Sequence, residues 1–63
     1  MKYLNSHIAE LIEGKKVTYH GKVYWANTET REIYAHSVDA EIAGSISGYK
    51  VADITDDFQI VKA

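Results

Sequence analysis

The fold is decided by one stretch of the chain, Lys16-Val17-Thr18-Tyr19-His20-Gly21-Lys22-Val23-Tyr24-Trp25-Ala26. Both halves of this stretch are rich in β-branched and aromatic residues, which fit a pleated surface. Between them stands His20-Gly21, a two-residue connection whose glycine readily adopts the positive φ of a tight hairpin turn. The stretch therefore predicts an antiparallel hairpin in which Tyr19 lies opposite Lys22 and Val17 lies opposite Tyr24.

The residues before the hairpin predict one short helix, over roughly residues 5–13. Four apolar residues recur there at helical spacing and share one stripe: Leu4, Ile8, Leu11 and Ile12. Asn5 or Ser6 is expected to cap the first turn, and Gly14 stands where a left-handed C-terminal cap is typical. A helix this short is marginal alone, so we expect its apolar stripe to pack on the sheet.

The residues after the hairpin predict short strands joined by turns. Asn27-Thr28-Glu29-Thr30 has the composition of a polar turn in which the Asn27 side chain bonds the backbone two residues on. Three further strands are expected at residues 32–36, 49–54 and 58–61, with a turn at 55–57 before the last of them.

The segment between the third and fourth strands is ambiguous from sequence. Residues 39–44 fit either a single helical turn, capped by Asp39 and ended by Gly44, or the start of a strand. Residues 44–48 are rich in glycine and serine, which favours a flexible or bulged connection.

These elements predict an α+β fold: one N-terminal helix packed on a four- or five-stranded antiparallel meander, short enough to curl into a small SH3-like barrel. The chain of 63 residues allows a single domain, residues 1–63. It contains no cysteine, so neither disulfides nor thiolate metal sites compensate for its small core. Small domains also gain stability by association, and we therefore expect a homodimer, formed through an edge strand or an exposed helix face.

Composition and charge exclude several function classes. The net charge of −2 is too weak for a DNA mimic and lacks the basic surplus that drives non-specific nucleic-acid binding. No apolar run approaches the roughly 18 residues that span a bilayer, and the first residues have no apolar stretch of signal-peptide length. We expect a soluble, cytoplasmic protein without membrane contact.

No catalytic or metal-binding pattern is present in the sequence. The three histidines, His7, His20 and His36, lack the spacing that metal sites use. Asp56 and Asp57 are adjacent, so on a strand their side chains would point to opposite faces rather than act as a pair. We expect a non-enzymatic protein with no cofactor and no bound metal.

Five tyrosines and one tryptophan are the most informative part of the composition. The economical arrangement places Val23, Trp25, Ile33 and Ala35 against the helix. It leaves a tyrosine-rich outer face as the candidate partner-binding site, formed by Tyr19, Lys22, Tyr24, Tyr34 and His36. The opposite arrangement, with Val17, Tyr19 and Tyr24 in the core, is also compatible with the sequence.

The sequence leaves two function hypotheses. The first is a small protein-binding module, an adaptor or inhibitor-type accessory protein of the kind common in bacteria and phages, because tyrosine is enriched in interfaces. The second is a single-stranded nucleic-acid binder that stacks bases on aromatic rings and contacts phosphates through Lys16, Lys22, Arg31 and Lys50. Tyrosines also stabilise a solvated sheet face by cross-strand pairing, which requires no partner.

Overall fold

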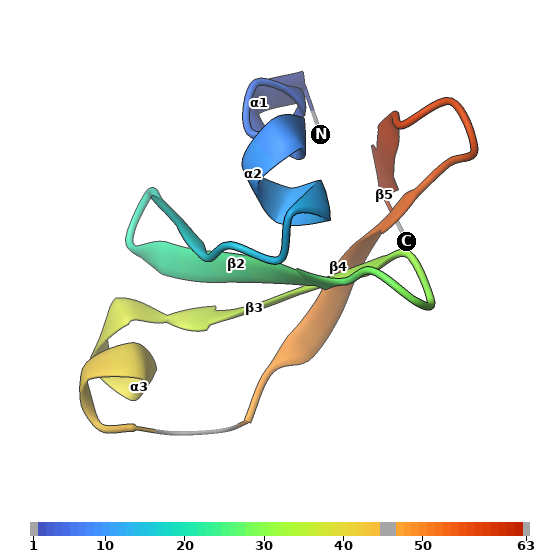
Figure 1. Ribbon diagram of the computed structural model, residues 1–63. Helices are drawn as coiled ribbons and strands as arrows, with labels where there is room; N and C mark the ends of the chain where they lie inside the picture. Colours follow the sequence, from blue (N-terminus) through green and yellow to red (C-terminus); the bar gives the residue numbers. More distant parts are fainter. Residues whose placement is uncertain (1, 45–46, 63) are drawn as a thin grey trace.

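The computed structural model describes residues 2–44 and 47–62 of the chain. It contains eight elements: α1 (Lys2–Asn5), α2 (Ile8–Ile12), β1 (Val17–Tyr19), β2 (Lys22–Asn27), β3 (Glu32–Ser37), α3 (Val38–Ile42), β4 (Tyr49–Ile54) and β5 (Ile60–Lys62). The five strands form one antiparallel sheet in the order β1-β2-β3-β4-β5, and this sheet curls into a half-barrel (Figure 1). The predicted α+β class, with helical residues at the N-terminus and an antiparallel meander, is confirmed.

The hairpin of β1 and β2 has the predicted register, with Val17 opposite Tyr24 and Tyr19 opposite Lys22. His20 and Gly21 both have positive φ, 50° and 74°. Positive φ at both central residues is the feature of the type I′ turn, whose twist matches that of the two strands it joins. Local turn chemistry therefore sets the pairing of this half of the sheet.

The N-terminal helix is divided into α1 and α2, whereas the sequence predicts one continuous helix. The expected cap at Asn5 or Ser6 is wrong, since α2 begins after His7, which makes no side-chain capping bond. The Asn5 side chain is engaged elsewhere: its Oδ1 accepts a hydrogen bond from the Ile60 backbone N–H at 3.0 Å. This contact joins the end of α1 to β5, on which α1 packs. Gly14 follows the helix with φ 83°, as expected for a left-handed cap.

The core lies between the helical segment and the concave side of the sheet (Figure 1). Leu4 of α1 and Leu11 of α2 are fully buried there, together with Ile33 of β3. The other buried members of this cluster come from all five strands: Val17, Tyr24, Ala35, Ala52, Ile54 and Ile60. Leu4, Ile8 and Leu11 of the predicted helical stripe pack on the sheet, whereas Ile12 is 40% exposed.

The prediction that Val23 and Trp25 share the helix-covered face with Ile33 and Ala35 is wrong. Tyr24 pairs with Ala35, so its ring shares the concave, helix-covered face with Ala35 and is only 4% exposed. Trp25 pairs with Tyr34, and both lie on the outer face. The alternative arrangement, with Val17, Tyr19 and Tyr24 on the core side, is the correct one. A one-residue difference in pairing between two strands moves every side chain of one strand to the other face.

The ambiguous segment at residues 39–44 begins as a helix, since α3 covers Val38–Ile42. The Oγ of Ser37, and not Asp39, caps α3 by accepting from the Ala40 N–H at 3.1 Å. The final strand starts later than expected, at Ile60, because Phe58 has φ 58° and belongs to the turn. Of the predicted flexible connection, residues 45 and 46 lie outside the described residues. No helix among the described residues is long and apolar enough to cross a membrane.

Candidate functional site

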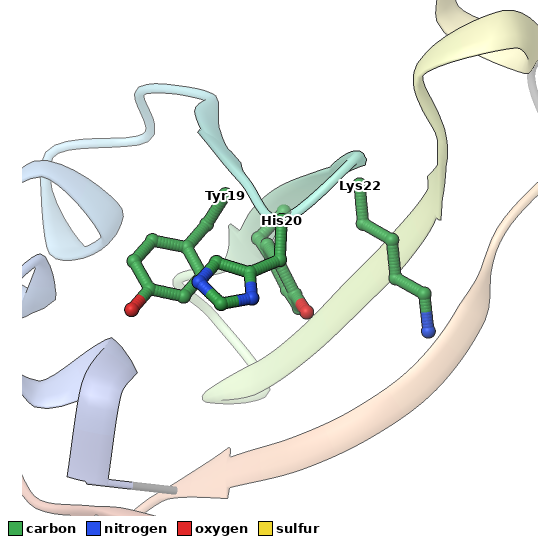
Figure 2. A pocket seen from close by; sticks show the side chains of 4 residues that line it. Tyr19, His20 and Lys22 are labelled. Carbon is green, nitrogen blue, oxygen red and sulfur yellow. The ribbon is translucent and has the colours of Figure 1, made fainter.

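A cleft of about 290 Å³ opens beside the hairpin and is lined by Tyr19, His20, Lys22 and Tyr24. Figure 2 shows the Tyr19 and His20 rings side by side on one wall and the Lys22 side chain on the other. Lys22 and Tyr24 are two positions apart on β2, so they point to the same side of the sheet. We call this site the hairpin cleft.

Stacked rings hold the aromatic wall of the hairpin cleft in place. The ring of Tyr19 stacks on that of His20, with centroids 4.2 Å apart and planes 8° from parallel. His7, which precedes α2, meets the Tyr19 ring edge-on at 5.8 Å. From the sequence, His20 was expected only to form the hairpin turn and His7 only to lie near the start of the helix. The contact of His7 with Tyr19 depends on the helical segment lying over the hairpin, which no local sequence pattern reports.

The floor and rim of the hairpin cleft differ in character. Tyr24 forms the floor, and because its ring belongs to the hydrophobic core the floor is fixed. Lys22 is exposed and its ammonium lies 5.6 Å from the ring centroid of Tyr49 on β4, an exposed aromatic residue. The hairpin cleft thus combines aromatic rings with one lysine ammonium. Such a site suits a flat apolar group that stands next to a carboxylate.

The remaining two predicted site residues lie on the outer face of the sheet. His36 is 6% exposed, and its Nδ1 donates to the Ser47 carbonyl at 2.8 Å. Its Nε2 lies 2.9 Å from Oε1 of Glu41. Both ring nitrogens therefore face oxygen atoms, one on the backbone and one on a carboxylate. These contacts join β3 to α3 and to the segment before β4, which is a structural role.

Tyr34 belongs to a network of charged groups on the same outer face. Its hydroxyl donates to Oε1 of Glu32 at 3.0 Å, and this hydrogen bond raises the pKa of Tyr34. The hydrogen bond from Lys50 to Glu32, followed by those of Thr30 and Tyr34, lowers the pKa of Glu32. The pKa of Lys50 is raised in turn, first by Asp53 and then by Glu32. The expectation that all five predicted residues share one outward face is therefore wrong.

Lys16, Arg31 and Lys50, which the nucleic-acid hypothesis invokes, are each paired with a carboxylate. The shortest N–O distances are 2.8 Å for Lys16 with Glu41, 2.7 Å for Arg31 with Asp56, and 2.9 Å for Lys50 with Asp53. Pairing of this kind offsets the charge that a phosphate backbone would require. Among residues 2–44 and 47–62, no group of three His, Cys, Asp or Glu side chains is placed to hold a metal ion.

Comparisons with known proteins add no family to this description. No family model matches the chain, and no curated protein or solved structure matches it significantly. What the protein does must therefore be inferred from the chemistry of its own side chains.

Proposed function

We propose that this protein is a non-catalytic protein-binding module that holds a partner's side chain in the hairpin cleft. One observation carries the proposal: a cleft of about 290 Å³ with an aromatic wall fixed by stacking and a lysine at its rim. Pockets for small molecules span about 300–1,000 Å³, and this cleft lies at the small end of that range, a size that one or two side chains can fill. An adaptor or an inhibitor would use such a site.

The charge around the cleft points to the chemistry of the partner. Residues 15–25 contain three lysines and no acid. Lys15 and Lys16 pair with Glu13 and Glu41, and Lys22 is the lysine that lines the cleft. A partner segment with an aromatic or apolar residue next to a carboxylate matches this combination, since the ring fits the tyrosines and the carboxylate pairs with Lys22.

Protein binding is favoured over single-stranded nucleic-acid binding by the ion pairs. A nucleic-acid groove needs a row of cations that follows the phosphates. Here Lys16, Arg31 and Lys50 each contact a carboxylate, and the chain has a net charge of −2. The aromatic hairpin remains the argument for base stacking, and a salt titration distinguishes the two functions.

The proposal is tested by selecting peptides from a random heptapeptide library on the wild-type protein. The selected peptides are then measured on two variants with the same charge change. Lys22→Glu alters the rim of the cleft, whereas Lys62→Glu alters an exposed lysine of β5.

We expect the selected peptides to share an aromatic residue beside Asp or Glu, and to lose about tenfold or more in affinity on Lys22→Glu only. Peptides that bind both variants equally would contradict the proposal. Tight, salt-sensitive binding of an oligothymidine that Lys22→Glu abolishes would instead establish the nucleic-acid function.

A further inference from the structure

The turn between β4 and β5 presents an exposed aromatic residue. Phe58 is 51% exposed, and its φ of 58° lies in the left-handed region, which is uncommon for a bulky side chain. Hydrogen bonds fix this backbone: the Phe58 N–H donates to the Thr55 carbonyl at 2.9 Å. The Gln59 N–H donates to Oγ1 of Thr55 at 3.1 Å. These bonds hold the turn backbone at Phe58 in the left-handed conformation.

A carboxylate stands next to the Phe58 ring in this turn. The Arg31 guanidinium lies 5.6 Å from the ring centroid and pairs with Asp56 at 2.7 Å. This pairing offsets the charge of Asp56, whereas Asp57, the exposed residue directly before Phe58, forms no ion pair within residues 2–44 and 47–62. We call Asp57 and Phe58 the acidic-aromatic turn.

The acidic-aromatic turn has the chemistry that the hairpin cleft would accept. The two features lie on opposite sides of the molecule, the β1–β2 turn on one side and the β4–β5 turn on the other (Figure 1). The molecule is elongated, with extents of 34 × 22 × 20 Å, and the two turns stand apart from each other in one copy. A contact between them requires two molecules.

We propose that the acidic-aromatic turn of one copy inserts into the hairpin cleft of a second copy, in a head-to-tail contact. Phe58 then lies against the tyrosine rings, and Asp57 pairs with Lys22. A symmetric contact between two acidic-aromatic turns is disfavoured because it would bring the two Asp57 carboxylates together. This inference rests on the proposed function of the cleft and names its occupant.

A head-to-tail contact has a predictable behaviour. It uses different surfaces on the two partners, so it continues into open chains or closes into rings. Two short turns bury less than the roughly 1,000 Å² of a stable interface, so the association is reversible and grows with concentration.

Sedimentation velocity over a concentration series of the full chain tests the proposal. Lys22→Glu reverses the charge at the cleft, and Phe58→Gly removes the ring without straining the turn, since glycine adopts the left-handed conformation readily. Each variant alone is expected to lose about tenfold or more in self-association. An equimolar mixture of the two is expected to form a dimer and nothing larger, because one intact cleft then meets one intact turn.

A second measurement uses charge exchange. Asp57→Lys is expected to abolish self-association, and the double variant Lys22→Glu with Asp57→Lys is expected to restore it. Lys62→Glu serves as the control and should associate as the wild type does.

Two results would overturn the inference. One is a wild-type protein that stays monomeric at every concentration, and the other is a mixture of the two single variants that stays monomeric while the wild type associates. If the wild type is monomeric but Lys22-dependent peptides are still selected, the proposed function stands and only its assignment to a second copy fails.

Discussion

The two faces of the sheet are held in different ways. On the concave face, α1 and α2 place fully buried leucines, Leu4 and Leu11, into an apolar core. On the outer face, α3 buries none of its residues and is held by polar contacts, mainly those of Glu41 with His36 and Lys16. Apolar burial does not depend on protonation, whereas an ion pair does. The comparison predicts that the two faces respond differently to side-chain truncation and to pH.

The largest effect is expected from Leu11→Ala, which opens a cavity in the concave core. Replacing a fully buried leucine by alanine lowers the free energy of unfolding by about 2–5 kcal/mol, a large share of the stability of so small a domain. Urea denaturation followed by circular dichroism measures the loss. The neighbouring Ile12 is 40% exposed and provides the control, since Ile12→Ala should cost clearly less. Equal losses would mean that the core is not where the structure puts it.

The next effect is expected from Gly48→Ala, which tests the packing of the outer face. A Cβ at Gly48 would lie 2.5 Å from Cη2 of Trp25, so the indole must move. That ring is packed against Tyr34 and His36, and overpacking of this kind costs about 1–3 kcal/mol. Trp25 is the only tryptophan, so its fluorescence reports the shift directly.

Gly14→Ala is the matched control for the substitution at Gly48. Gly14 has positive φ but open space around it, so alanine there strains the backbone without touching the indole. We expect a loss of stability with unchanged fluorescence. An unchanged spectrum in Gly48→Ala as well would contradict the close contact between Gly48 and Trp25.

A smaller effect is expected from Asn5→Ala, which separates α1 from β5. In this variant the backbone N–H of the buried residue Ile60 loses its acceptor. We expect the free energy of unfolding to fall by about 1–2 kcal/mol as a result. Asn5→Asp keeps an acceptor oxygen at the same position and should recover most of the loss. Amide hydrogen exchange at Ile60 checks the contact itself, and slow exchange in Asn5→Ala would show that the bond is dispensable.

The sequence predicts the parts of this fold that depend on neighbouring residues. The hairpin register follows from His20-Gly21, and the helical stripe of Leu4 and Leu11 follows from spacing. The assignment of side chains to the two faces failed because it depends on the register of β2 against β3 across the Asn27 turn. A shift of one residue in that register moves every side chain of one strand to the other face. The break after Asn5 was equally hidden, since the partner of that side chain is 55 residues away.

The candidate site was also predictable only where its residues lie close together in the sequence. Tyr19, Lys22 and Tyr24 meet in the cleft because one hairpin places them together. Tyr34 and His36 were assigned to the same surface, yet long-range partners on α3 and β4 engage them on the outer face. Phe58 was assigned to a strand because aromatic residues favour strands, whereas its left-handed φ places it in an exposed turn.

The smallest effect is expected from Glu41→Gln, and it depends on pH. Hydrogen bonds from Lys16 first, and from His36 second, lower the pKa of Glu41 below its ordinary value of 4.5. A carboxylate with a lowered pKa stabilises the fold above its unfolded value and loses that contribution as the pH falls through its folded value. The urea midpoints of wild type and Glu41→Gln should therefore differ most above pH 4.5 and converge in acid.

Glu29→Gln is the control for this pH dependence, because Glu29 lies in the β2–β3 turn and forms no ion pair within the described part of the chain. Its midpoint should follow that of the wild type at every pH. If the gap caused by Glu41→Gln persists in acid, then α3 is held by hydrogen-bond geometry that an amide cannot reproduce, and not by charge. The contrast between a pH-independent concave face and a pH-dependent outer face would then have to be abandoned.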